Sequence, residues 1–323
     1  MMLAGVSSEH GLQISHVARP EPAEGQVLVD VAAAGMNRAD LNAAKGGGVA
    51  TRDSLGRPVG MEWAGRIVAV GAGVTAFAIG DMVACSGTGG YAEYAVADAG
   101  RCLPLAEGLD PTEAGGLRVA LMTAHNALVT EGNFQRDMTV LVHGASSAVG
   151  IAAMRIARLL GASIVMGTSS TLEKRNQLDT LGADVAIDSA RDDWVDEVLS
   201  ATGTRGADVV IDMVTGSGLN ATMRATAIHG TIVNVGRLGG LRCDLDLDLH
   251  SARRLRLTGV TFRTRSVPEI HAINTGVARD LWPQVMSGAL RLPIARAFPL
   301  AQAQDAHAFM AANHHLGKIL LVP

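Results

Sequence analysis

The stretch TVLVHGASSAVGIAAMRIARLLGA (residues 139–162) decides the fold that the sequence predicts. It begins as a short apolar strand, passes through a turn of small residues and continues as an amphipathic helix. Such a turn lets backbone N–H groups approach a pyrophosphate, which the dipole of the helix N-terminus also attracts. The turn from Gly144 to Gly150 is not GxGxxG, since only its first and last residues are glycine. By itself the turn is weak evidence, because any strand-to-helix connection favours Gly and Ser.

The same alternation continues after this stretch. Further apolar strands are expected at residues 163–168, 184–188, 208–213, 231–236 and 256–261. Helical segments such as 149–162 and 172–183 lie between them and end in Gly-Ala, where glycine can adopt the left-handed conformation that terminates a helix. Apolar strands alternating with amphipathic helices predict a parallel sheet covered on both faces. The fold class is therefore α/β, with a Rossmann doubly wound parallel-sheet domain.

The residues before about 117 have a different character. Short strands separated by glycines, such as 27–35 and 65–74, predict a β-rich, barrel-like domain. One helix is expected near residues 38–44. The chain ends in an apolar strand, KILLVP, and the tail that carries it is too short to form a domain. We therefore expect residues 289–323 to return to the domain formed by residues 1–116, with residues 117–288 as the nucleotide-binding domain.

Composition excludes several classes of function. The 323 residues are 48% hydrophobic and 18% charged, with a net charge of −4 and scattered basic residues, so no nucleic-acid footprint is present. The N-terminus lacks the features of a signal peptide, and the most apolar helical stretch, 151–160, contains two arginines and is too short to span a bilayer. The cysteines are far apart in sequence and signal neither a disulfide framework nor a thiolate metal site. We expect a soluble cytoplasmic protein that binds neither nucleic acid nor membranes.

The strand after the phosphate turn indicates which dinucleotide fits. NAD sites place Asp or Glu about 20 residues past the turn, where it holds the ribose 2′-hydroxyl. Here that strand ends in GTSS without an acid, and Lys174 and Arg175 follow. Hydroxyls and a cation suit a 2′-phosphate, so NADP(H) is the expected cofactor, with Ser169 and Lys174 at the phosphate. The alternative is that Lys174 and Arg175 are solvated helix residues.

Six segments in order resemble the zinc-free quinone oxidoreductase branch of the medium-chain dehydrogenase/reductase superfamily, over nearly the whole chain. They are AAGMNRADL (33–41), GMEWAGRIVAVGAGV (60–74), GDMVACSGTGGYAEYAV (80–96), VHGASSAVG (142–150), LGADVAID (181–188) and ANHHLGKILL (312–321). The resemblance implies a GroES-like β-rich catalytic domain built from both ends of the chain, with the Rossmann NADP(H)-binding domain inserted. It also implies a homodimer, for which the edge strand near 255–262 is the candidate contact.

The resemblance further implies a set of site residues. Asn37 and Thr123 would be catalytic and would contact the nicotinamide. The cofactor would also contact Ser146, Ser147, Ala148, Val149, Ser169, Lys174, Ser189, Val214, Gly236, Arg237, Leu238, Phe262, Arg263, Thr264, Asn313 and Lys318. More ordinary roles remain open for three of these residues: Asn37 as a helix cap, Thr123 as a helix residue and Lys318 as a surface charge.

Three departures from related proteins bear on the site. The zinc-dependent relatives have cysteine and histidine where this chain has Asn37 and Met61, so no metal is expected. A tyrosine that often borders the substrate pocket is replaced within Gly46-Gly47-Gly48, which predicts an open, mobile loop. A second tyrosine at the adenine-ribose end is replaced by Ser189. Tyr91 and Tyr94 are expected to pack or hydrogen-bond structurally.

The expected reaction is hydride transfer from NADPH to a quinone or another α,β-unsaturated carbonyl. The reduced form of such an acceptor is a stabilised anion that water can protonate, whereas a plain ketone would need a Lewis acid or a proton donor. An enoyl-thioester reductase remains an alternative, as does a nucleotide-binding protein with little turnover in a structural or regulatory role. A zinc alcohol dehydrogenase would require about one zinc per chain.

Overall fold

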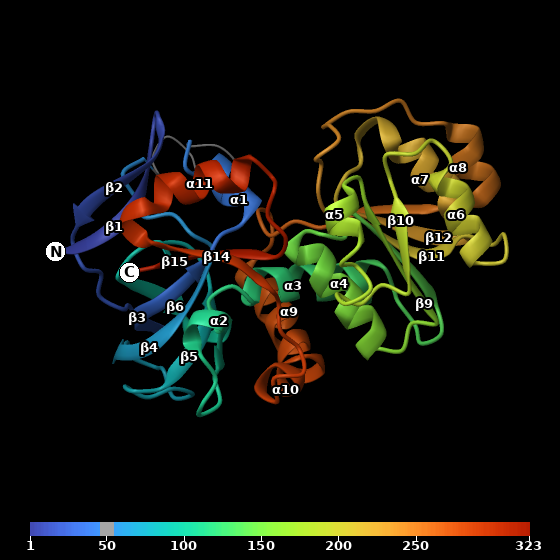
Figure 1. The fold of residues 1–323 in the computed structure, drawn as a ribbon. Helices are drawn as coiled ribbons and strands as arrows, with labels where there is room; N and C mark the ends of the chain where they lie inside the picture. The colour runs from blue at the N-terminus through green and yellow to red at the C-terminus, as the bar shows by residue number, and fades with distance from the viewer. Residues whose placement is uncertain (46–54) are drawn as a thin grey trace. The chain divides into compact units, whose positions relative to one another are not determined.

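The computed structural model describes residues 1–45 and 55–323. The Gly46–Gly48 loop, for which the sequence predicts mobility, lies outside the described residues. Contacts divide the chain into two compact units (Figure 1): Met1–Ala120 with Arg263–Pro323, and Leu121–Phe262. The sequence pattern puts the second division at 288/289 instead, so the contacts assign residues 263–288 to the first unit.

The first unit consists mainly of strands. Their bounds are β1 (Met2–Ser8), β2 (Gly11–Val17), β3 (Gln26–Gly35), β4 (Glu62–Val70), β5 (Met82–Ser86), β6 (Tyr94–Asp98), β7 (Cys102–Pro104), β14 (Ile294–Pro299) and β15 (Lys318–Val322). The larger sheet has the order β14-β15-β3-β4-β5-β7, β6 also pairs with β3, and β1 and β2 form a hairpin. β15 pairs antiparallel with β3, so the C-terminal strand lies in the sheet of the first unit.

Helices and a packed core complete this unit. The helices are α1 (Arg38–Ala43), α2 (Pro111–Ala114), α9 (Val267–Asp280), α10 (Trp282–Met286) and α11 (Ala303–Ala311), with short 3-10 turns at Ala99–Arg101 and Leu300–Gln302. Alternate residues of β3, such as Val27, Val29 and Val31, are buried in a core that also contains Trp63 and Ile67. The side chains alternate because successive residues of a strand point to opposite faces of the sheet.

The second unit is the α/β unit. Its strands are β8 (Thr139–His143), β9 (Ile164–Ser169), β10 (Val185–Asp188), β11 (Ala207–Asp212), β12 (Thr226–Asn234) and β13 (Arg256–Gly259), all parallel, in the order β10-β9-β8-β11-β12-β13. The helical segments are α3 (Arg118–His125, which begins in the first unit), a π-helical turn (Asn126–Glu131), α4 (Ala148–Leu159), α5 (Leu172–Arg175), α6 (Trp194–Ala201), a 3-10 turn (Gly216–Gly218), α7 (Leu219–Ala225) and α8 (Leu247–Arg253). The strand order reverses between β8 and β11, which is where doubly wound sheets bind dinucleotides.

The sequence pattern and the structure differ at two places in this unit. The expected helix at 172–183 stops at Arg175, and turns follow it. The segment CDLDLDL (243–249) alternates as a strand does, yet its last three residues are helical. Asp246 accepts a hydrogen bond from the Leu249 N–H at 2.9 Å and thereby caps α8, which begins at Leu247. A side-chain cap outweighs weak alternation because it satisfies an otherwise unpaired amide.

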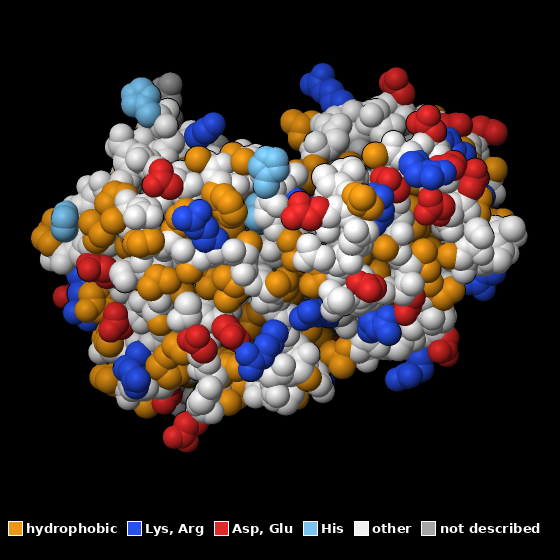
Figure 2. Space-filling view, in the orientation of Figure 1, with side chains coloured by type: hydrophobic (Ala, Val, Ile, Leu, Met, Phe, Trp, Pro, Cys, Tyr) orange, Lys and Arg blue, Asp and Glu red, His pale blue; other side chains and the backbone are white. Residues whose placement is uncertain are grey.

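The surface has mixed charge. Figure 2 shows Lys and Arg side chains interspersed with Asp and Glu on the visible face. Within residues 1–45 and 55–323, no helix has both the length and the apolar character needed to cross a bilayer.

Candidate functional site

The turn between β8 and α4 is built for close backbone approach. Gly144 has φ +84°, and the ideal Cβ of a larger residue there would lie 3.2 Å from the Met213 Cβ. At Gly150 an added Cβ would lie 2.7 Å from the Ala145 carbonyl oxygen, a backbone atom that cannot rotate away. Both positions therefore require glycine, which explains why these two, and not the middle of the turn, carry it.

Hydrogen bonds within the turn fix its shape. The Ser147 hydroxyl donates to the Gly144 carbonyl and accepts from the Gly150 N–H, both at 3.0 Å. Ser147 is thus the N-cap of the 12-residue helix α4. The first turn of a helix has amides without carbonyl partners inside the helix, and one cap satisfies only part of them. The Ala148 and Val149 amides and the half-buried Ser146 suit a pyrophosphate.

The carboxyl end of β9 suits a phosphate better than a bare ribose hydroxyl. Ser169 is buried at the tip of β9, and its register partner on β10 is Asp188. Arg175 Nη1 lies 2.9 Å from Asp188 Oδ2, so a guanidinium neutralises the nearest strand-end carboxylate. Lys174 is half-buried on α5. The half-buried Ser189 directly follows β10.

Three polar residues that the sequence analysis does not identify lie side by side at the carboxyl ends of three neighbouring strands. His143, Asp212 and Asn234 are register neighbours on β8, β11 and β12. Asp212 is fully buried, and its Oδ1 accepts the N–H groups of Val214 and Thr215, each at 2.8 Å. Asp212 therefore shapes the loop that carries Val214. The only signal in the sequence was that each residue ends an apolar strand.

His143 is held as a neutral ring. Its Nδ1 lies 3.1 Å from the Thr168 hydroxyl, and its ring stacks on Trp194 with centroids 5.1 Å apart. Burial lowers the pKa of His143, although the Asp212 carboxylate opposes the shift. The ring therefore adds no charge to this strand edge near neutral pH.

In the first unit, Asn37 lies between two buried charges. Its Nδ2 donates to Glu62 Oε1 at 2.9 Å, and its Oδ1 accepts from Lys318 Nζ at 3.0 Å. Lys318 Nζ also donates to Glu62 Oε1 at 2.5 Å. Glu62 and Lys318 are 0% and 2% exposed. Gly35 makes room for this pair, since a Cβ there would lie 2.6 Å from Glu62 Oε1.

A second buried carboxyl group adjoins this cluster. Asp40 Oδ2 accepts from the Tyr91 hydroxyl and from the Asn37 backbone N–H, both at 2.8 Å. Burial raises the pKa of Asp40 to about 6, although Tyr91, the Asn37 N–H and Lys318 each pull it down. Burial and the Asp40 carboxylate raise the pKa of Tyr91 well above its usual value. Tyr91 therefore has the structural role that the sequence predicts.

Comparisons with known proteins agree with both units. An alcohol dehydrogenase GroES-like domain model matches residues 23–107, and a zinc-binding dehydrogenase model matches residues 148–275. Quinone oxidoreductase of the rat (Rattus norvegicus) is 30% identical over 311 residues, covering 95% of this chain and 92% of its own. Mycobacterial Rv1454c, solved in complex with NADPH, superposes with a TM-score of 0.88 at 28% identity, with all of both chains covered. A phenolphthiocerol/phthiocerol polyketide synthase of Mycobacterium tuberculosis is 29% identical over 310 residues, 96% of this chain but 14% of that protein.

The chain belongs to the quinone oxidoreductase branch of the medium-chain dehydrogenase/reductase superfamily. The resemblance inferred from six sequence segments is thereby confirmed, as are the GroES-like and Rossmann folds. This quinone oxidoreductase homologue contains, within the residues described, no group of three or more His, Cys, Asp or Glu side chains able to hold a metal.

The predicted site residues of this homologue fall into separate groups. One follows the carboxyl ends of the Rossmann strands: Ser146 to Val149, Ser169, Lys174, Ser189, Val214 and Gly236 to Leu238. Another, in the first unit, contains Asn37 and Lys318. The interpretation of Lys318 as a surface charge is wrong, because β15 returns beside β3 and buries the ammonium.

The remaining predicted residues have varied surroundings. Thr123 is buried in α3, whereas Phe262 is half-buried and Arg263 and Thr264 are exposed after β13. The exposed Asn313 has φ +58° and accepts from Arg38 Nη2 at 2.7 Å.

Proposed function

We propose that this protein binds NADP(H) and reduces a quinone or another α,β-unsaturated carbonyl without zinc. When bound, the dihydronicotinamide supplies the hydride. The observation that carries the proposal is the β8–α4 turn, with its two obligatory glycines, together with the acid-free tip of β9. The NADPH complex of a relative at 28% identity supports the same cofactor.

The chain's residues would bind the cofactor in three places. The Ala148 and Val149 amides and Ser146 would hold the pyrophosphate, while Ser147 mainly keeps the turn in shape. Ser169 and Lys174 would take the 2′-phosphate. The proposed lining of the rest of the cofactor is Asn37, Thr123, Ser189, Val214, Gly236, Arg237, Leu238, Phe262, Arg263, Thr264 and Asn313, with Lys318 acting through Asn37.

The acceptor class follows from the available polar groups. Asn37 can donate one hydrogen bond to an oxygen that gains negative charge. Tyr91 is a poor proton donor, because its hydroxyl is buried and already bonded to Asp40. An acceptor whose reduced form is a stabilised anion therefore fits better than a plain ketone. The Lys318 ammonium, 3.0 Å from Asn37 Oδ1, would also repel a divalent cation there.

The test begins with the cofactor. NADPH and NADH are titrated separately, with the fluorescence of bound nucleotide as readout, on wild type, Lys174→Ala and Arg205→Ala. Arg205 is a control cation of the same unit, exposed at the amino end of β11 and paired with Asp208. We expect NADPH to bind more tightly than NADH and only Lys174→Ala to reduce the preference. Equal affinities would refute the 2′-phosphate site, and binding of neither would refute the oxidoreductase function.

The acceptor is then identified by steady-state NADPH oxidation with a quinone, an enone, an enoyl thioester and a simple ketone. Turnover of the quinone or enone supports the proposal. Preference for the enoyl thioester would favour the alternative suggested by the polyketide synthase relatives. Tight NADPH binding without any turnover would favour a structural or regulatory role.

We also propose that the protein is a homodimer. β13 is the last strand in the order of the second unit's sheet, and its Leu257 is 44% exposed. An edge strand presents unpaired N–H and C=O groups to a second copy. Light scattering after size-exclusion chromatography should give twice the chain mass of 33.4 kDa, and a monomer would refute the proposal.

A further inference from the structure

The carboxamide of Asn37 is held in one of two nearly isosteric orientations. Its oxygen faces the Lys318 ammonium, and its nitrogen faces a carboxylate oxygen of Glu62, at 3.0 and 2.9 Å. A rotation of 180° would put the oxygen against a carboxylate and the NH₂ group against an ammonium. Both contacts would become repulsive where little water can screen them. The two charges thus favour the orientation in which Nδ2 is the donor, as does the capping box of α1, in which the Asn37 side chain faces the Asp40 backbone N–H.

Glu62 and Lys318 are themselves held in place by a full set of hydrogen bonds. The three Lys318 Nζ hydrogens have three acceptors: the Met36 carbonyl at 2.8 Å, Asn37 Oδ1 and Glu62 Oε1. The second oxygen of Glu62 accepts the Val119 N–H at 2.7 Å. A rotation of either charged side chain would therefore break bonds at buried groups, which is costly.

A contribution to stability does not by itself explain why Glu62 and Lys318 form a buried ion pair. Replacing a buried ion pair with apolar residues of similar size is often neutral or stabilising. What apolar residues cannot do is distinguish the two ends of a carboxamide. The arrangement is therefore better explained by its effect on Asn37 than by its own contribution to stability.

We propose that Glu62 and Lys318 are positioning residues that keep Asn37 as a hydrogen-bond donor to the acceptor's oxygen. This inference rests on the proposed function. One Nδ2 hydrogen is bonded to Glu62, and the other has a long contact of 3.4 Å with the Gly35 carbonyl, which an acceptor oxygen can replace. The ammonium on Oδ1 draws electron density from the amide and makes this N–H a better donor. With the amide reversed, its oxygen would repel the negative charge that develops during reduction.

A double-mutant cycle tests this coupling. Glu62→Gln is made in wild type and in Asn37→Ala, and kcat for quinone reduction is measured with the dissociation constant for NADPH. We expect Glu62→Gln to lower kcat about 10- to 100-fold in wild type, with NADPH affinity unchanged, and less than about twofold in Asn37→Ala. Equal losses in both backgrounds would show that Glu62 acts independently of Asn37 and would overturn the inference.

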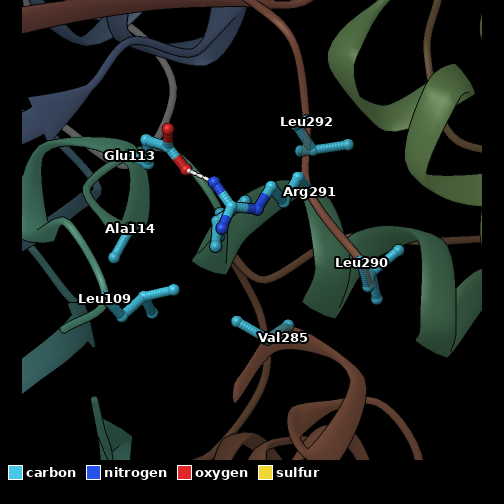
Figure 3. A pocket seen from close by; sticks show the side chains of 8 residues that line it. Leu109, Glu113, Ala114, Val285, Leu290, Arg291 and Leu292 are labelled. Carbon is cyan, nitrogen blue, oxygen red and sulfur yellow. Dashed lines mark hydrogen bonds and ion pairs between the residues drawn. The ribbon is translucent and has the colours of Figure 1, made fainter. Parts of the chain in front are cut away.

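Two further variants separate positioning from folding. Glu62→Gln/Lys318→Met removes both charges and leaves no unpaired buried ion, so we expect a folded protein, judged by circular dichroism, with kcat reduced to a similar extent. Glu113→Gln breaks the half-exposed ion pair with Arg291 at 2.6 Å, beside a small cavity of about 10 Å³ in the same unit (Figure 3). This control should keep kcat within about twofold of wild type.

A measurement on the wild-type protein avoids mutation altogether. In ¹⁵N-labelled protein, the two Asn37 Nδ2 protons should resonate far apart, because one is bonded to a carboxylate, and should exchange slowly by rotation. Two averaged resonances typical of a solvated asparagine would overturn the inference. Absence of acceptor turnover in wild type would overturn the proposed function and this inference together. Turnover that is insensitive to Asn37→Ala, or additive losses in the cycle, would overturn only the inference.

Discussion

Asp40→Asn should change how stability depends on pH. Burial raises the pKa of Asp40 from 3.8 to about 6, so between these values the folded protein binds a proton that the unfolded chain has released. Stability contributed by this group is therefore present below pH 3.8 and is lost as the pH rises toward 6. About two pKa units at 1.36 kcal/mol each give a loss of about 3 kcal/mol.

The substitution keeps the shape and the acceptor. An asparagine oxygen can still accept from the Tyr91 hydroxyl and the Asn37 N–H, but the side chain does not titrate. Any fixed cost of the new NH₂ group is the same at every pH. The charged and titratable neighbours Glu62, Lys318 and Tyr91 are present in both proteins and cancel in the comparison to first order.

The assay is urea unfolding from pH 4 to 8, with the free energy of unfolding of wild type minus that of Asp40→Asn plotted against pH. We expect this difference to fall by about 2 kcal/mol between pH 4 and pH 6 and to level off by about pH 7, because the rest of the 3 kcal/mol is lost below pH 4 and above pH 6. His307, whose pKa burial lowers to about 4, titrates in the same range but is common to both proteins. Asp305→Asn, at an exposed carboxyl group of α11, is the control and should give a flat difference. A flat or rising curve for Asp40→Asn would refute the assignment of Asp40 as a buried carboxyl with a raised pKa.

Other positions give simpler tests. Gly150→Ala should lower the free energy of unfolding by about 1–3 kcal/mol and weaken NADPH binding at least about tenfold, because its Cβ would meet a backbone oxygen at 2.7 Å. The control is Gly218→Ala, whose Cβ would have no atom within 4 Å, and it should change neither the stability nor NADPH binding. Ser147→Ala should cost about 1 kcal/mol in chemical denaturation through loss of the α4 cap, and no change would contradict that role. In the native protein, a thiol reagent should modify only Cys243 rapidly, because the other two cysteines are buried, and all three should react in urea; rapid reaction of two or three native thiols would contradict this burial.

Much of the Rossmann unit could be predicted because its strands carry their own signal. The apolar runs at 139–143 and 207–212 are buried on both faces of a parallel sheet, so their composition alone distinguishes them from surface segments. The prediction was weakest where a local hydrogen bond decided the conformation. Asp246, for example, starts a helix within a segment whose alternation resembled a strand.

Pairings between distant residues were not predictable in this way. Cys85 and Cys102 are far apart in sequence, yet β5 and β7 place them opposite each other with sulfur atoms 3.5 Å apart. Burial raises the pKa of Cys85 well above its usual value, so Cys85 behaves as an apolar core residue. Nothing in the spacing of the two residues indicates that their strands are neighbours.

The sequence by itself determined the division into a β-rich and an α/β unit and the class of cofactor, because periodicity, glycine positions and the residues at a strand tip are local properties. Only the tertiary structure decided the surroundings of Asn37. Leu320 of β15 pairs with Gly35 of β3, and Gly35 pairs with Glu62 of β4, which brings Lys318 to a carboxylate 256 residues earlier in the chain. The energy of that contact depends on strand register and on exclusion of water, and both arise only when the sheet has formed.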